Sequence, residues 1–210
     1  MSTTLSPAQE RIITQWLDPT TPHTHIHAAG RRSGLSTIAV HAIVQAAHNY
    51  LHDQTDRQPN RAFTLYVPTP ATAKVYTNLV DARLQAILAA FPLAFRPHTA
   101  NQIRYDDKIA TIRVQAATPN TVRGFANDAA VLVDFAYYKD PTNFYTAFRP
   151  SVVATTGRTL ILSNPRPEDP NNYFHFLFHG HKDTALVQEH QALNPLETSP
   201  QEPFQVPNPY

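Results

Sequence analysis

Residues Gly30–Thr37, with the sequence GRRSGLST, have the outline of a phosphate-binding loop. In the motif G-x-x-x-x-G-K-[ST], backbone N–H groups surround the phosphates, the lysine reaches the β- and γ-phosphates, and the hydroxyl binds Mg²⁺. Gly34 and Ser36 lie at their positions in this motif, but Leu35 replaces the lysine. Gly30 is one residue closer to Gly34 than the motif requires. The sequence on either side must therefore decide whether the match is meaningful.

The flanking segments supply the strand and the helix that such a loop needs. Residues 23–29 are predicted to form a short strand that runs directly into the loop. Residues 36–51 contain no glycine or proline and carry apolar side chains around the whole helix, a pattern typical of a buried helix. Strand, loop and helix in this order are the required setting for the motif.

Further apolar segments extend this unit into an α/β domain. A capped helix is predicted after Ser6, over residues 8–17, and a longer helix over about 71–90. The remaining apolar runs predict strands at 62–67, 129–133 and 159–162, and a hairpin at 102–116. Strands that alternate with helices predict an α/β fold with a mostly parallel sheet.

Composition limits the class of protein. The chain has 210 residues, 42% of them hydrophobic, so one domain with a sizeable core is expected. Its formal net charge of +1 makes any DNA contact local. A cytoplasmic protein is expected, because no apolar run reaches membrane-spanning length and the first ten residues do not form a signal sequence. The absence of cysteine excludes disulfides and a cysteine nucleophile.

Prolines mark an expected division of the chain. There are 19 prolines and only 5 glycines, and Pro195, Pro200, Pro203, Pro207 and Pro209 fall near the end. This distribution predicts an ordered domain over residues 1–185 and a proline-rich tail or linker over 186–210.

Polar residues close the predicted strands at the edge where parallel sheets bind their ligands. Asp134 follows the apolar run 129–133, and Ser163 and Asn164 follow 159–162. Four apolar residues followed by aspartate match the second nucleotide-site motif, whose carboxylate holds Mg²⁺ through its water shell. A buried strand can also end in aspartate for structural reasons alone. The joint order of loop, Asp134 and Ser163-Asn164 is what predicts a nucleotide site.

Two longer segments resemble one protein family. Thr121–Tyr137 (TVRGFANDAAVLVDFAY), continued through 148–151 and Gly157–Pro165 (GRTLILSNP), is similar to the ATPase domain of tailed-phage large terminases, the motors that package viral DNA. Leu5–Gln9 (LSPAQ) resembles the family's adenine-recognising glutamine motif, and Tyr66–Thr69 (YVPT) resembles one of its strand ends.

This similarity covers roughly residues 5–180. It implies a P-loop NTPase fold of the ASCE or RecA-like class, in which a mostly parallel sheet is flanked by helices. The loop at 30–37 would then be the Walker A motif, and Asp134 would belong to the Walker B motif.

The resemblance also implies roles for individual residues. It assigns Arg31 to stabilise charge on the γ-phosphate, and Ser36 and Asp134 to hold Mg²⁺. Ser163 with Asn164 would form the coupling motif that relays the nucleotide state to DNA movement. The remaining residues of the implied nucleotide site are Gln9, which would contact adenine, and Gly30, Arg32, Ser33, Gly34 and Thr37.

Two positions depart from the family pattern. Leu35 replaces the loop lysine, and Phe135 takes the place of the glutamate that activates water. Phosphoryl transfer needs positioned charge and an oriented nucleophile, so ATP hydrolysis is expected to be very slow or absent. Binding of ATP and Mg²⁺ is expected to be weak or vestigial. Replacing Leu35 by lysine together with Phe135 by glutamate is expected to restore part of the turnover if the scaffold is otherwise intact.

The leading hypothesis is therefore a pseudo-ATPase that acts as a packaging subunit or regulator in the host-cell cytoplasm. Its expected partners are other motor or portal proteins, with duplex DNA and further copies of the chain as additional candidates. One alternative is an active ATPase with substitute residues, in which Lys139, Lys108 or Arg123 supplies the cation. Asp128 or Asp140 would then approach the attacking water. The other alternative is an interaction module that binds a terminase or portal partner without nucleotide.

Histidines form two groups in the sequence. His23, His25 and His27 alternate along a predicted strand. His175, His179 and His181 lie in the aromatic-rich segment HFLFHGH. Each group has a metal-binding interpretation and a structural one. For the first group the structural interpretation is a histidine face packed under a helix.

Overall fold

The computed structural model describes residues 4–30, 32–88, 94–97, 101–166, 168–169, 172–179 and 187–193. Its helices are α1 (Pro7–Leu17), α2 (Leu35–His52), α3 (Pro70–Leu88), α4 (Pro119–Val122), α5 (Pro141–Val153) and α6 (Tyr173–His179), with a 3₁₀ turn, η1, at Phe135–Tyr137. Its strands are β1 (Thr24–Ala29), β2 (Asn60–Val67), β3 (Ala94–Pro97), β4 (Asn101–Tyr105), β5 (Lys108–Ala116), β6 (Ala129–Val133), β7 (Arg158–Ser163) and β8 (Val187–Leu193).

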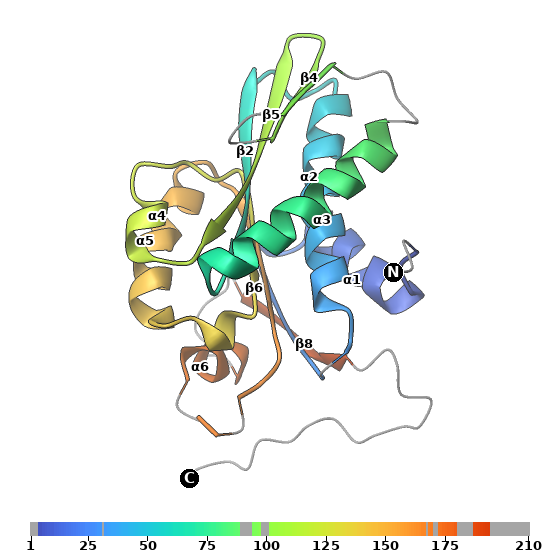
Figure 1. The fold of residues 1–210 in the computed structure, drawn as a ribbon. Coiled ribbons are helices and arrows are strands. Elements are labelled where there is room, and N and C mark those ends of the chain that lie inside the picture. The colour runs from blue at the N-terminus through green and yellow to red at the C-terminus, as the bar shows by residue number, and fades with distance from the viewer. Residues whose placement is uncertain are drawn as a thin grey trace.

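The described strands form one sheet in the order β3-β4-β5-β2-β6-β7-β1-β8. All neighbouring pairs from β5 to β8 in this order are parallel, while β3, β4 and β5 are joined by antiparallel pairs. Figure 1 shows α1, α2 and α3 on one side of the sheet and α4, α5 and α6 on the other. The expected α/β architecture with a mostly parallel, helix-flanked sheet is confirmed.

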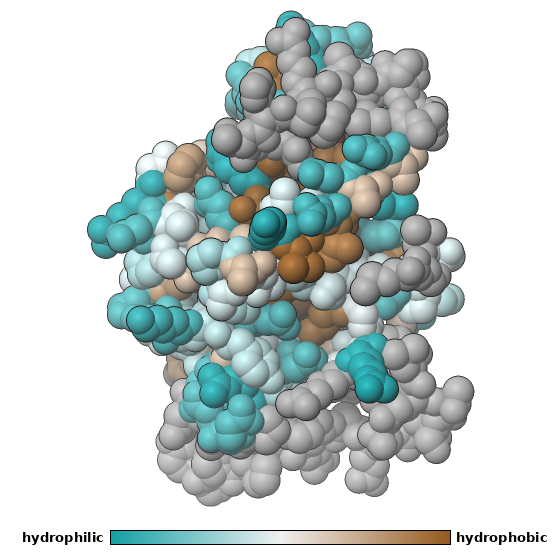
Figure 2. All heavy atoms as spheres, viewed as in Figure 1, coloured by the Kyte–Doolittle hydropathy of each residue, from teal (hydrophilic) through white to brown (hydrophobic). Residues whose placement is uncertain are grey.

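The core is divided by the sheet into two clusters. Val131 and Val133 pack with the α1, α2 and α3 side, whereas Ala130 and Leu132 pack with the α5 and α6 side. Every residue of β6 is buried, which explains why this strand has a continuous apolar sequence. Figure 2, viewed as in Figure 1, shows apolar side chains gathered in the middle of the visible face, with hydrophilic ones among and around them.

Local sequence signals account for several element ends. Ser6 is the N-cap of α1, and it forms a capping box with Gln9 in which each side chain accepts from the other's backbone N–H. The hairpin between β4 and β5 turns at Asp106, whose φ of 53° is left-handed. Aspartate tolerates this conformation better than most residues, so the turn forms without glycine.

Several parts of the fold lie outside the elements expected from the sequence, among them β3, α4 and η1. Helices α5 and α6 were not predicted; Asp140 caps α5, and Pro141 stands in its first turn. Within the segment expected to be a tail or linker, residues 187–193 form β8, which adds to the open edge of β1. Residues 186 and 194–210 lie outside the described residues.

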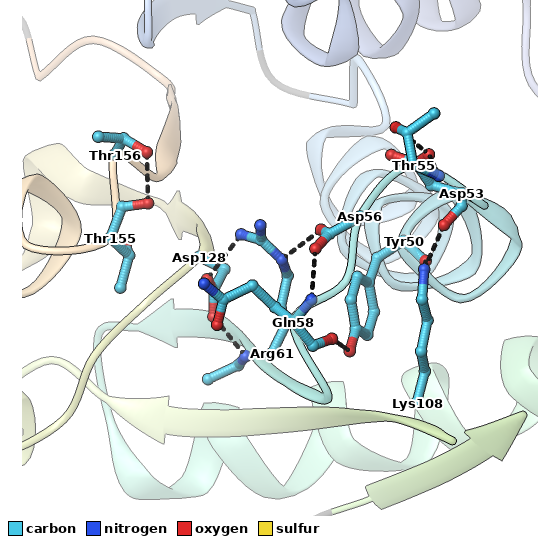
Figure 3. A network of polar contacts seen from close by, with 11 residues as sticks. Tyr50, Asp53, Thr55, Asp56, Gln58, Arg61, Lys108, Asp128, Thr155 and Thr156 are labelled. Atoms are coloured by element: carbon cyan, nitrogen blue, oxygen red, sulfur yellow. Dashed lines mark hydrogen bonds and ion pairs between the residues drawn. The ribbon is translucent and has the colours of Figure 1, made fainter. Parts of the chain in front are cut away.

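A polar network fastens the amino-terminal ends of β2 and β6 (Figure 3). The guanidinium of Arg61 pairs with Asp128 at 2.8 Å and with Asp56 at 2.6 Å. The second carboxylate oxygen of Asp128 accepts a hydrogen bond from Ala62 N at 2.7 Å, which ties β6 to β2 directly. Lys108 donates to the backbone oxygens of Tyr50 and Asp53, where α2 ends.

We expect Arg61→Met to lower the free energy of unfolding by about 1–3 kcal/mol, because it leaves the partly buried Asp128 carboxylate without its cation. Urea unfolding measures the change. Arg166→Met is the matched control, since Arg166 pairs at 3.1 Å with Glu168, which is 60% exposed. That change should stay within about 0.5 kcal/mol. Equal effects of the two variants would contradict the structural role given to Arg61.

Candidate nucleotide site

The loop between β1 and α2 changes direction through two left-handed residues. Arg32 has a φ of 65°, and Gly34, the N-cap of α2, has a φ of 78°. Gly34 O accepts the first helical hydrogen bond, from Ile38 N at 3.0 Å. The sequence therefore places a glycine where helix entry needs a positive φ. Ser36, expected to bind Mg²⁺, is an exposed residue in the first turn of α2.

Gln9 holds this loop from the side of α1. Its Nε2 donates to Ser33 O at 3.0 Å, while its Oε1 accepts from Ser6 N at 2.9 Å. A Cβ atom at position 34 would overlap Gln9 Nε2, so a side chain there would displace the Gln9 amide from this contact. The residue expected to contact adenine thus also fixes the loop.

Ser163 and Asn164 join the loop to the turn after β6. Asn164 Nδ2 donates to Ala29 O at 2.8 Å and to Gly30 O at 3.0 Å, where the loop begins. Ser163 Oγ accepts from Ala136 N at 3.0 Å, within the turn that starts at Asp134. The end of β7 is therefore in direct contact with both predicted motifs.

Asp134 is a largely desolvated carboxylate on a left-handed backbone. Its φ of 54° lies in the left-handed region, and burial raises its pKa above the ordinary value for aspartate. Asn172 supports the same turn by donating from Nδ2 to Ala136 O at 2.9 Å. The turn is thus held by β7 and by the segment that enters α6.

Tyr76 of α3 is a residue of this site that the sequence did not reveal. Its hydroxyl donates to Ser36 Oγ at 2.7 Å, although the two residues are forty positions apart. Burial raises the pKa of Tyr76 to about 12, and the charge of Asp134 adds to this rise. Tyr76 is therefore a neutral hydrogen-bond donor to Ser36, and it lies close enough to Asp134 to feel its charge. An isolated tyrosine on an amphipathic helix carries no sequence signal for such a contact.

The two residues expected to replace catalytic groups, Leu35 and Phe135, both belong to the hydrophobic core. Leu35 is 7% exposed and packs in the cluster beneath α1 and α2. Phe135 is fully buried on the opposite side of the sheet, with its ring centroid 5.0 Å from that of Tyr138 and 6.0 Å from that of Tyr145. Neither side chain is therefore exposed at a position where it could contact a nucleotide.

The other expected loop residues have different environments. Ser33 is 2% exposed, and its Oγ has no hydrogen-bond partner among the described groups. Arg32 is exposed, whereas Gly30 and Thr37 are half-buried. Arg31, expected to stabilise the γ-phosphate charge, lies outside the described residues.

Three of the proposed substitute residues are engaged elsewhere. Lys108 and Asp128 stand at the amino-terminal ends of β5 and β6, whereas Asp134 follows the carboxyl-terminal end of β6. Asp140 accepts from the backbone and the side-chain amide of Asn143, as the cap of α5. Together with Arg123, it lines a cavity of about 550 Å³ beside α4 and α5. These positions do not favour Lys108, Asp128 or Asp140 as groups of the nucleotide site.

The histidines of the two groups differ in burial. His25 and His27 are 0% and 1% exposed, and their ring centroids lie 6.4 Å apart. His23 is exposed, with Nδ1 3.2 Å from Gly157 O. His175 is buried, while the His179 side chain and all of His181 lie outside the described residues. Among the residues that the structure describes, no three or more potential metal ligands gather together.

Sequence comparison finds no matching family model and no matching curated protein. Comparison of structures, in contrast, finds ATPase domains of phage large terminases. The Thermus phage P74-26 large terminase ATPase domain matches with a TM-score of 0.65 and 20% identity, over 83% of this chain and 69% of that one. This chain has the fold of a terminase ATPase domain. The fold that the resemblance implied is thus confirmed.

Two other large terminases show the same fold over a smaller share of their chains. The large terminase from a thermophilic bacteriophage in complex with ADP has a TM-score of 0.66 and 13% identity, with 90% of this chain and 45% of that chain covered. The HK97 bacteriophage large terminase has a TM-score of 0.63 and 15% identity, with 84% and 36% covered. The chain thus spans less than half of these two proteins.

In the described part of the chain, no helix is both long enough and apolar enough to cross a membrane.

We expect Asp134→Asn to make the protein more stable at neutral pH. Burial raises the pKa of Asp134 in the folded state. Ionisation of this side chain therefore lowers the free energy of unfolding, and the loss is complete above the raised pKa. The loss disappears as pH falls toward the ordinary carboxyl value. The stability gained by the variant should therefore be small at about pH 4 and grow toward about pH 7. Urea unfolding across this range measures the gain.

Asp140→Asn provides a control of opposite sign. Hydrogen bonds from Asn143 lower the pKa of Asp140, so its ionised form contributes stability that is lost as pH falls. Asp140→Asn should therefore destabilise the protein at neutral pH and lose this effect in acid. Parallel pH profiles for the two variants would contradict the environment assigned to Asp134.

Proposed function

We propose that the chain is a catalytically impaired packaging-motor subunit or regulator, which binds ATP or ADP with Mg²⁺ weakly and hydrolyses ATP very slowly or not at all. One observation carries this proposal: Leu35 and Phe135, at the positions of the catalytic lysine and glutamate, are both packed into the hydrophobic core. The loop that contains Leu35 is nevertheless held in place by Gln9 and Asn164. The site thus combines a supported phosphate loop with core residues at its two catalytic positions.

Support for nucleotide binding comes from the remaining loop and from similar proteins. Backbone N–H groups at the start of α2 favour an anion, and Ser36 and Asp134 provide the oxygen ligands that Mg²⁺ prefers. A phage large terminase of the same fold has been described with ADP and with ATP-γ-S. Arg31 and Arg32 are the nearby cations in the sequence that would offset part of the phosphate charge.

Calorimetry and thermal unfolding with Mg·ADP test the binding step. A nucleotide at ten times its Kd should stabilise the folded state by about 1.4 kcal/mol. Asp134→Ala should remove the Mg²⁺-dependent part of this effect, whereas Asp140→Ala, at the cap of α5, should retain it. No stabilisation by Mg·ADP at millimolar concentration would instead support an interaction module without a nucleotide role.

Steady-state hydrolysis tests the catalytic step. We expect the wild-type rate to equal that of Asp134→Ala within error. A rate well above that of this variant would overturn the pseudo-ATPase proposal in favour of an active ATPase with substitute residues.

We further propose that the chain acts in viral DNA packaging in the host-cell cytoplasm, with other motor or portal proteins as partners and with the capacity to form homo-oligomers. This step rests on the terminase fold. Duplex DNA is a second proposed partner, and local contact with phosphates predicts an affinity that falls steeply with salt. Affinity independent of salt would contradict phosphate contact as its basis.

A further inference from the structure

A cavity of about 480 Å³ lies between α5 and α6, away from the candidate nucleotide site. It reaches His23 and Thr24 at the start of β1 and Thr159 at the start of β7. Asp134 and Ser163, in contrast, lie where β6 and β7 end. The cavity is therefore at the other end of the sheet. Its volume is within the range of sites that bind small molecules or peptide side chains.

The cavity has aromatic walls and an exposed apolar rim. Tyr145 and Phe148 of α5 and Tyr173 and Phe176 of α6 line it. Phe176 is 49% exposed, and Val153, also in the lining, is 62% exposed. Apolar side chains left open to solvent around a concave surface are typical of a docking site.

The charge of the lining has one sign. Arg149 is the permanently charged residue of the described lining, which also contains His23 and has no carboxylate. Burial raises the pKa of Tyr145 to about 12 and raises that of Tyr173, while the charge of Arg149 opposes both shifts. The guanidinium is therefore close to the aromatic walls. An occupant that combines an apolar ring with a carboxylate fits these surroundings.

Such a combination occurs in the sequence after β8. Residues 194–210 contain Glu197 and Glu202, no lysine, arginine or histidine, and a proline-rich run, PQEPFQV, at 200–206. Proline-rich segments lose little entropy on binding and dock into aromatic-lined grooves. We propose that residues 200–206 of this chain bind in the cavity between α5 and α6, with Phe204 against the aromatic walls and Glu202 beside Arg149.

The length of the chain is sufficient for this contact within one molecule. β8 is the edge strand, and its last residue, Leu193, pairs with Ala29 at the end of β1. The cavity begins at Thr24, and a strand of this length spans about 20 Å. In a polyproline conformation, the eleven residues 194–204 would reach over about 34 Å. Because no strand lies beyond β8 in the described sheet, this segment can pass the edge to the α5 and α6 side.

Disulfide trapping tests the contact, since the chain contains no native cysteine. Val153→Cys is combined with Gln205→Cys in the full chain and compared with Val75→Cys combined with the same Gln205→Cys. Val75 is the matched control because it is 57% exposed but lies on α3, on the other side of the sheet. Under mild oxidation, we expect the intramolecular disulfide to Val153→Cys to form at least about ten times faster than that to Val75→Cys. Non-reducing gels and peptide mass mapping measure both rates.

Arg149→Glu in the Val153→Cys background tests the charge contact and should slow trapping at least about threefold. Equal trapping at Val153→Cys and Val75→Cys would overturn the proposal. A disulfide that forms only between molecules would assign the cavity to a second copy and also overturn binding within one chain. Trapping unaffected by Arg149→Glu would overturn the placement of Glu202. Thermal unfolding of each reduced variant checks that the fold is retained.

Discussion

Phe135→Glu is expected to unfold the protein or nearly so, with a loss of more than about 4 kcal/mol in the free energy of unfolding. Phe135 is fully buried, and its ring lies among those of Tyr138, Tyr145 and Tyr173. A carboxylate at this position would lose both the aromatic packing and its own hydration. The structure therefore argues against restoring turnover by combining this change with Leu35→Lys.

Tyr137→Glu is the control for this prediction. Tyr137 belongs to the same 3₁₀ turn but is 39% exposed, so glutamate there remains hydrated. Urea unfolding should show a loss of no more than about 1 kcal/mol, including the contact with Arg166. A folded Phe135→Glu variant of similar stability would mean that position 135 can face the nucleotide after all.

Asn164→Asp is expected to have the second largest effect, a loss of about 3 kcal/mol in stability together with loss of nucleotide binding. The wild-type amide donates to Ala29 O and Gly30 O. A carboxylate cannot donate to them and would repel both oxygens, which detaches the loop from the end of β7. Urea unfolding and Mg·ADP calorimetry measure the two losses.

Asn143→Asp is the matched control for the second variant. Asn143 is an exposed amide on α5, so the same change there should leave nucleotide binding unaltered. If Asn164→Asp bound Mg·ADP as tightly as the wild type, Asn164 would not be the link that holds the loop.

Much of the fold was predictable because its signals are local. The loop from Gly30 to Gly34 is marked by its glycines, and β6 is marked by a continuous apolar run that reflects burial on both faces. The capping box of Ser6 and Gln9 likewise lies within four residues. Signals of this kind survive in a single sequence because neighbouring residues carry them.

The orientation of Phe135 was not predictable from strand periodicity. Alternation would place it on the same face as Val131 and Val133, beneath the helices α1 to α3. The left-handed backbone of Asp134 turns the chain instead, and Phe135 packs on the face of Leu132. A single φ angle thus decides which core receives the side chain.

Contacts between residues far apart in the sequence were not predictable either, because they depend on how the elements pack. The hydrogen bond from Tyr76 to Ser36 depends on how α3 packs against α2, and the pair of Arg61 with Asp128 depends on the register of β2 and β6. Neither arrangement has a pattern that one sequence displays. The packing of α5 and α6 belongs to the same class, because their aromatic residues meet only after the sheet has formed.

The two hydrogen bonds of the Gln9 side chain make the position of the loop depend on the first turn of α1. One amide group completes the cap of α1 and also binds Ser33 O. Fraying of the first turn of α1 would release both contacts at once, so the phosphate loop would loosen without any change in the sheet. A partner that grips or displaces residues 4–9 would thereby control the loop from outside the site. Hydrogen exchange at the start of α2 would then follow the opening of α1 rather than global unfolding.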